Sequence, residues 1–176
     1  MLDNARVVVA DANIPTESLR WLAENCAAPL FVDPVSTTKA EKLRNILGSI
    51  HTLKPNKLEA ELLSGIPIHN IEDLERAADK LLSTGLRRIF ISLGGDGVYA
   101  ASHHSSAHLD NIPGNMVNTT GCGDAFMASL VWSFMEGFDL TESARAGLAA
   151  GSIAMESAQT INPNMSAEAL KQRMAR

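Results

Sequence analysis

Residues 71–101 have the sequence IEDLERAADKLLSTGLRRIFISLGGDGVYAA, and this stretch decides the fold class. Its first part predicts a helix over residues 71–84, ended by Gly85, because apolar residues recur there at helical spacing: Leu74, Ala77, Ala78, Leu81 and Leu82. The run Ile89-Phe90-Ile91 predicts a buried strand, and residues 98–101 predict a strand that returns as a hairpin. A helix followed directly by a buried strand is the repeating unit of an α/β protein.

The rest of the chain continues this alternation on both sides. Before the central stretch, strands are expected at 6–11, 30–32 and 51–54, and helices at 16–25, 39–47 and 56–64. After it, residues 103–108 are expected to form an outer edge or loop, followed by helices at 121–136, 141–157 and 166–175. We therefore predict a three-layer α/β/α fold with a largely parallel sheet, in one domain over residues 1–176.

Composition excludes several classes of function. With 45% hydrophobic and 20% charged residues, the chain is typical of a globular protein and not of a disordered one. The net charge of −5 gives no reason to expect nucleic acid or anionic lipid as a partner, so any phosphate must be bound locally. No membrane span or signal peptide is evident, which predicts a cytoplasmic protein. The tryptophans, Trp21 and Trp132, are interpreted as core residues.

The chemistry is expected at residues 118–126, NTTGCGDAF, where a long apolar helix begins. Gly121 and Gly123 let a ligand approach the backbone closely, and a helix N-terminus offers unpaired N–H groups to phosphate oxygens. Asp124 lies in the first turn, where a carboxylate can accept a proton from an attacking hydroxyl. The alternative is a tight loop in which Asp124 only stabilises the helix dipole.

Three segments resemble the motifs of the PfkB/ribokinase family of carbohydrate and nucleoside kinases. NTTGCGDAF is similar to the family signature DTTGAGDAF, residues 54–60 (KPNKLEA) to its Asn-x-x-Glu motif, and residues 92–97 (SLGGDG) to its Thr-Leu-Gly-x-x-Gly loop. They occur in the family's order, and the resemblance covers essentially the whole chain. It implies a ribokinase-like fold and ATP-dependent phosphorylation of a sugar or nucleoside hydroxyl.

The resemblance also implies residue roles. Asp124 would be the catalytic base, and an anion hole would be formed by the backbone amides of Gly121, Cys122 and Gly123. Asn56 and Glu59 would organise Mg²⁺ and the ATP phosphates, largely through water; the alternative is a helix N-cap and a solvated helix carboxylate. The remaining cofactor-binding residues would be Ser92, Gly94 and Gly97 in the nucleotide loop, with Thr120 and Leu148.

Two positions depart from the family pattern. Asn118 replaces the first aspartate of the signature, which ligates a monovalent cation in relatives that use one, and this weighs against potassium activation. Cys122 stands at a position where the family uses only the backbone amide, so its thiol is interpreted as packed and inert. The resemblance further implies homodimers among the full-length relatives.

Within the family, NTTGCGDAF followed by MAS, together with KPNKLEAELLSG, most resembles pseudouridine kinases. Pseudouridine, converted to its 5′-phosphate, is therefore the preferred substrate, with ribose or another nucleoside as the alternative. Because nothing before Val7 could supply the family's N-terminal strands or substrate lid, the chain is expected to be a C-terminal portion. A truncated, non-catalytic nucleotide-binding fragment, or a flavodoxin-like module with a coincidental Gly-x-Gly-Asp, remain competing hypotheses.

Overall fold

The computed structural model describes residues 4–175, which form two compact parts. The sheet part contains the residues up to Leu93 together with Tyr99–Ser106. The helical part contains Gly94–Val98 and the residues from Ala107 onward. The single domain expected over residues 1–176 stays a prediction.

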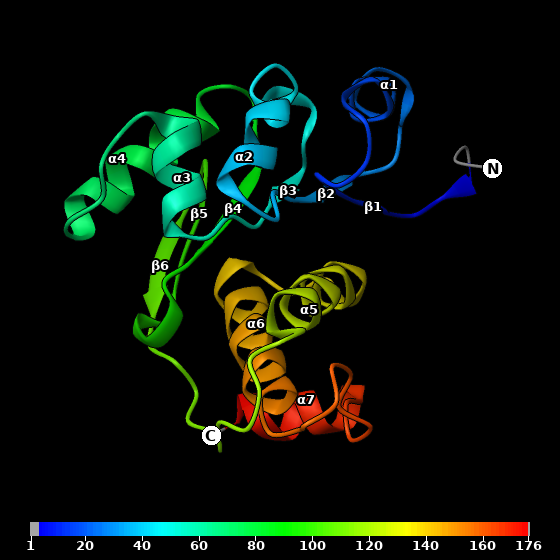
Figure 1. The fold of residues 1–176 in the computed structure, drawn as a ribbon, viewed down its shortest axis with the longest axis vertical. Helices are drawn as coiled ribbons and strands as arrows, with labels where there is room; N and C mark the ends of the chain where they lie inside the picture. Colours follow the sequence, from blue (N-terminus) through cyan, green and yellow to red (C-terminus); the bar gives the residue numbers. More distant parts are fainter. Residues whose placement is uncertain (1–3, 176) are drawn as a thin grey trace. The chain divides into compact units, whose positions relative to one another are not determined.

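The elements alternate along the chain as the sequence predicts (Figure 1). The strands are β1 (Val8–Asp11), β2 (Leu30–Asp33), β3 (Thr52–Leu53), β4 (Arg88–Ser92), β5 (Val98–Ser102) and β6 (Ser106–Leu109). The helices are α1 (Thr16–Asn25), α2 (Thr37–Ala40), α3 (Lys57–Ser64), α4 (Ile71–Leu82), α5 (Cys122–Glu136), α6 (Leu140–Ala154) and α7 (Ala167–Met174).

The six strands form one sheet in the order β1-β2-β3-β4-β5-β6. The pairs β1–β2, β2–β3 and β3–β4 are parallel. The connections before and after β5 are too short for a crossover, so β5 is antiparallel to its neighbours. The predicted α/β class with a largely parallel sheet is confirmed. Because the parallel strands follow one another in sequence order, right-handed crossovers place α1–α4 on the same face of the sheet, as Figure 1 shows.

The core of the sheet part is a continuous apolar cluster under these helices. Leu19, Leu43, Leu53 and Ile89 have no exposed surface in it. The predicted helix at 39–47 is wrong in detail, because α2 gives way to 3₁₀ turns at Glu41–Leu43 and Leu47–Ser49. These turns lay Gly48 on the backbone of Thr84, where a Cβ atom would be only 2.4 Å from the carbonyl oxygen.

In the helical part, α5 and α6 pack closely because Gly147 lies under the ring of Phe126. A Cβ atom at Gly147 would be 2.2 Å from that ring. α7 packs on α6 through Leu170, which joins the buried residues Ala149, Ala150 and Ile153. None of the helices described in residues 4–175 is long and apolar enough to cross a membrane.

The two tryptophans have different environments. Trp132 packs against the cluster of the helical part and meets Phe138 edge to face. Trp21 on α1 is 54% exposed, so its interpretation as a core residue is wrong. α1 faces the core with the buried Leu19 and the partly buried Leu22 and Ala23, which leaves the indole outside the core.

Candidate active site

The carboxyl ends of the parallel strands carry one group of candidate residues, which we call the strand-end cluster: Asp33, Lys54, Asn56, Glu59 and Ser92. In open α/β sheets ligands bind at this edge. An isolated parallel bridge joins Asn56 to Ser92, and the Ser92 N–H donates to the carbonyl of Pro55 at 2.9 Å. The structure therefore brings together three residues that the sequence assigned to nucleotide and Mg²⁺ binding.

Asn56 and Glu59 form a reciprocal capping box at the start of α3. The Glu59 N–H donates to Asn56 Oδ1 at 2.9 Å, and the Asn56 N–H donates to Glu59 Oε2 at 2.9 Å. The N-cap reading of Asn56 is thus correct. The solvated-carboxylate reading of Glu59 is wrong, because this residue is only 2% exposed.

Burial raises the pKa of the Glu59 carboxyl above its ordinary value. The Asn56 N–H and the positive charge of Lys54 act in the opposite direction, whereas the negative charge of Asp33 adds to the rise. Lys54 Nζ lies 2.9 Å from Asp33 Oδ2, and both side chains are largely buried. One ammonium group therefore lies among two carboxyl groups at the sheet edge.

Sequence reasoning did not single out Asp33 and Lys54 as site residues. A local signal was present, since each stands at the end of a predicted strand and directly precedes a proline. A proline at this point stops the strand and leaves the preceding side chain at its carboxyl end. That two such residues pair with each other depends on the sheet register, which the sequence does not show.

The second group of candidates is the α5 loop, residues 118–124, in the helical part. Gly121 has φ +87°, and a Cβ atom there would lie 2.4 Å from the carbonyl oxygen of Thr160. Only glycine combines this left-handed conformation with so close an approach. Its carbonyl accepts the Ala125 N–H at 2.9 Å and so begins α5.

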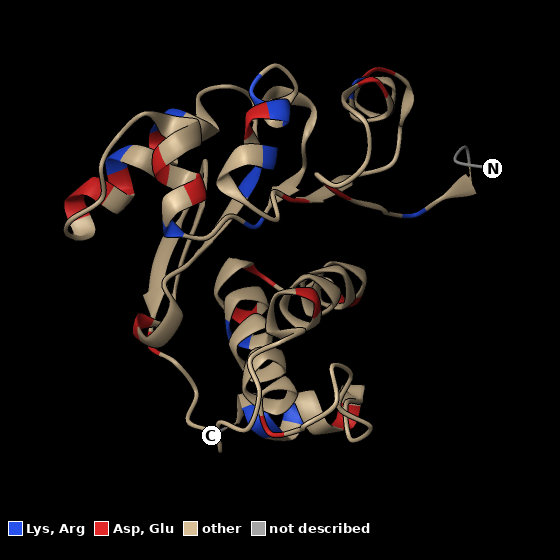
Figure 2. Cartoon of the chain, viewed as in Figure 1, with Lys and Arg blue, Asp and Glu red and all other residues tan. Residues whose placement is uncertain are grey.

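The α5 loop offers backbone donors and an acidic side chain, but no cationic one. Gly123 and Asp124 are exposed in the first turn of α5, so Asp124 is free to meet a ligand. The sequence contains no Lys or Arg between Arg88 and Arg145. Asp124 is the acidic residue in the first turn of α5. Figure 2 shows basic and acidic positions interspersed over the helices of the sheet part. Within the loop itself, the groups that can donate to an anion are therefore backbone N–H groups and the hydroxyls of Thr119 and Thr120.

In the α5 loop the backbone N–H of Cys122 is better suited to bind a ligand than its thiol is. Its N–H makes a long hydrogen bond of 3.3 Å to Thr119, weak enough to be exchanged for a phosphate oxygen. Its Sγ lies 3.7 Å from the carbonyl of Gly151. Burial raises the pKa of the thiol, which keeps it protonated and unreactive.

Asn118 fixes the beginning of the α5 loop through its carboxamide. Its Oδ1 accepts the Thr120 N–H at 3.0 Å, and its Nδ2 faces the carbonyl of Ala158 at 3.4 Å. Its own N–H donates to the carbonyl of Met155 at 3.1 Å. An uncharged side chain thus links the loop to the segment after α6.

The remaining predicted nucleotide residues have diverse environments. Gly94 has φ +63° with open space around it, as expected of a ligand-facing glycine. Gly97 has φ +86° and lies against the Leu109 backbone. Its contact with β6 is enough to require a glycine there, whether or not a ligand binds. Leu148 is buried in α6, and Thr120 is exposed. Ser92 belongs to the sheet part, whereas Gly94 and Gly97 belong to the helical part.

The chain is similar to known proteins in sequence and in fold. The pattern of pfkB family carbohydrate kinases matches residues 6–167. The chain belongs to this family. Pseudouridine kinase of Escherichia coli K12 is 44% identical over 94% of the chain, and ribokinase of Staphylococcus aureus is 33% identical over 73%. A Clostridium perfringens structure described as a sugar kinase superposes with a TM-score of 0.94 at 29% identity, over 99% of this chain and 55% of its own.

The chain spans about half the length of the pfkB relatives it matches. It covers 53% of the pseudouridine kinase and 42% of the ribokinase. The ribokinase-like fold of the chain agrees with its membership of the pfkB carbohydrate kinase family.

Proposed function

We propose that this chain provides the ATP-side portion, catalytic base included, of a kinase that phosphorylates a sugar or nucleoside hydroxyl. The supporting observation is the exposed carboxylate of Asp124 in the first turn of α5, next to glycines whose N–H groups begin the helix. In phosphoryl transfer a base must lie at the nucleophile and N–H donors must stabilise the charge on the transferred group. Asp124 would accept the hydroxyl proton, and the amides of Gly121, Cys122 and Gly123 would hold the phosphoryl oxygens.

The strand-end cluster fits Mg²⁺ in a water-mediated manner. Asn56 Oδ1 and Glu59 Oε2 each accept one backbone N–H and keep a further lone pair, and oxygen atoms are the ligands this ion prefers. When bound, the ion would neutralise charge on the ATP phosphates. Asn56 and Glu59 would orient its water shell, and Lys54 would add a positive charge beside it.

The test of the base is Asp124→Asn, which keeps the size of the side chain but cannot accept the proton. Removal of a general base lowers turnover about 10²–10⁴-fold. We expect phosphate transfer to fall by this factor while ATP·Mg²⁺ still binds in calorimetry. Glu136→Gln, an equal change of charge at the exposed far end of α5, is the control. Turnover that survives in the Asp124 variant would show the base assignment to be wrong.

Pseudouridine is the preferred substrate in this proposal, supported by 44% identity to a pseudouridine kinase. Ribose and other nucleosides are the alternatives. The competing hypothesis, a non-catalytic nucleotide-binding fragment, draws on the chain's length of about half that of its relatives. Calorimetry separates them: binding of both ATP·Mg²⁺ and pseudouridine supports the kinase, and nucleotide binding alone supports the fragment.

We further infer that the α5 loop works without a monovalent cation. The Asn118 carboxamide presents an N–H to the Ala158 carbonyl, where a cation site would need another oxygen. ATP·Mg²⁺ affinity is therefore expected to be equal in KCl and in tetramethylammonium chloride at the same ionic strength. A potassium-specific gain would contradict this inference.

A further inference from the structure

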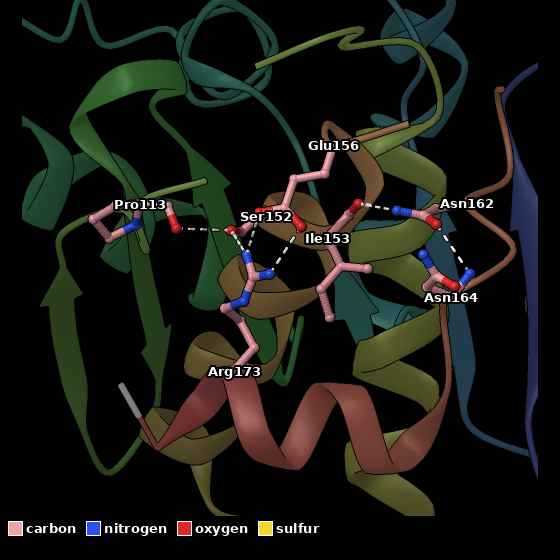
Figure 3. A network of polar contacts seen from close by, with 7 residues as sticks. All are labelled: Pro113, Ser152, Ile153, Glu156, Asn162, Asn164 and Arg173. Atoms are coloured by element: carbon pink, nitrogen blue, oxygen red, sulfur yellow. Dashed lines mark hydrogen bonds and ion pairs between the residues drawn. The ribbon is translucent and has the colours of Figure 1, made fainter. Parts of the chain in front are cut away.

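The C-terminal helix α7 is tied to the end of α6 by Arg173 (Figure 3). Its Nη1 and Nη2 atoms donate to Glu156 Oε1 and Oε2 at 3.0 and 2.9 Å, a bidentate pair. The Arg173 side chain is only 11% exposed, so water screens the pair little. Bidentate geometry fixes the direction of the guanidinium as well as its position.

Ser152 connects this ion pair to a different stretch of chain. Its Oγ accepts a hydrogen bond from Arg173 Nη1 and donates one to the carbonyl of Pro113 at 3.2 Å (Figure 3). The next residue, Gly114, lies directly on it, since a Cβ atom there would be 2.6 Å from Ser152 Oγ and 3.2 Å from Glu156 Oε1. The contact therefore fixes both the side-chain link and the path of the backbone at 113–114.

The same stretch continues into the α5 loop along the end of α6. The N–H groups of Val117 and Asn118 both donate to the carbonyl of Met155, at 2.8 and 3.1 Å. On the other side of this helix end, Asn162 Nδ2 donates to the carbonyl of Ile153 at 2.6 Å. The segment that leads to Gly121 thus takes its position from the last turn of α6 and from the residues that hold that turn.

We propose that Arg173 is a positioning residue for the anion hole: acting through Ser152 and Pro113, it sets the path of residues 113–118 and so the orientation of the backbone donors at the α5 loop. This rests on the proposed function, because donors must be pre-oriented only if they bind a ligand. A merely structural Arg173 would instead hold α7 on α6 and leave the loop unaffected.

Ser152→Ala distinguishes the two roles in the full 176-residue chain. It removes the link to Pro113 but leaves the Arg173–Glu156 pair intact, and alanine suits a helix interior. Hydrogen exchange of the free protein is the readout. We expect the Val117 and Asn118 amides to exchange roughly tenfold faster, the loss expected for one hydrogen bond between neutral groups, while α7 keeps its protection.

Two further variants complete the experiment. Arg173→Ala should speed exchange both in residues 113–118 and in α7, and Arg145→Ala, an exposed arginine on α6, should change neither. Unchanged exchange at Val117 and Asn118 in the Ser152 variant would overturn the inference. An increase in the exchange of the α7 amides as large as that at Val117 and Asn118 in this variant would overturn it as well. ATP·Mg²⁺ binding is measured on the same proteins: a weaker Kd in the Ser152 variant supports the inference. A wild-type chain that binds no nucleotide would count against the proposed function alone, because the exchange measurement needs no ligand.

Discussion

The strand-end cluster and the α5 loop, each within its own part of the molecule, are built by opposite means. In the cluster, charged side chains are buried and have partners: Lys54 pairs with Asp33, and Glu59 accepts a hydrogen bond from the Asn56 backbone. In the α5 loop the carboxylate is exposed, and the geometry is set by backbone conformation at Gly121. The first region is organised by electrostatics and the second by sterics.

This difference decides which kind of substitution damages each region. A buried ion pair is sensitive to loss of one partner, since the other charge is left in a poorly solvated place. A loop shaped by close backbone approach is sensitive to added atoms and indifferent to charge. Each of the following predictions tests one side of this comparison.

The largest effect on stability is expected from Lys54→Met, which leaves the carboxylate of Asp33 without its cation. Loss of one partner of a buried pair costs about 3–5 kcal/mol, and we expect about 3 because Asp33 retains some exposure and accepts the Val35 N–H. Urea unfolding measures the loss. Lys57→Met, an equal substitution at an exposed position of α3, should change little. Adding Asp33→Asn to Lys54→Met should recover part of the loss; failure to do so would mean that the charge was not its cause.

A smaller effect is expected from Gly121→Ala, for which Gly137→Ala is a matched control. Both glycines have positive φ, +87° and +79°, but a Cβ atom would meet the Thr160 carbonyl at Gly121 and open space at Gly137. The left-handed conformation alone costs an alanine roughly 1 kcal/mol. We expect about 2 kcal/mol at Gly121, since the exposed segment at Thr160 must shift, and about half of that at Gly137. Equal losses in thermal unfolding would remove the close approach from the explanation.

The two regions also differ in how far the sequence could predict them. The α5 loop is encoded locally, because Gly121, Gly123 and Asp124 indicate the backbone conformation and the start of the helix within a few residues. The pairing of Asp33 with Lys54 is non-local and exists only once β2 and β3 are in register. Non-local packing also explains why the predicted helix at 39–47 was wrong in detail. The contact of Gly48 with the backbone of Thr84 overrides a good helical pattern there. The α/β class was predictable because apolar runs and helix stops alternate regularly, whereas the order of the strands in the sheet was not predicted.

The smallest effect concerns the pH dependence caused by Glu59. Because burial raises the pKa of its carboxyl, the folded state binds this proton more tightly than the unfolded chain does. The contribution of Glu59 to stability is therefore greatest below its ordinary pKa of 4.5 and is lost as the pH rises through the folded value.

Glu59→Gln removes this dependence while its carbonyl still accepts the Asn56 N–H. Urea midpoints from pH 4 to pH 7 should show the variant gaining on the wild type as pH rises, by about 1 kcal/mol or less. Glu75→Gln, at an exposed position of α4, should run parallel to the wild type. If Glu59→Gln also ran parallel to the wild type, burial of the ionised Glu59 carboxylate would not lower the stability of the fold. The strand-end cluster would then not contain a charge that is buried at the expense of stability.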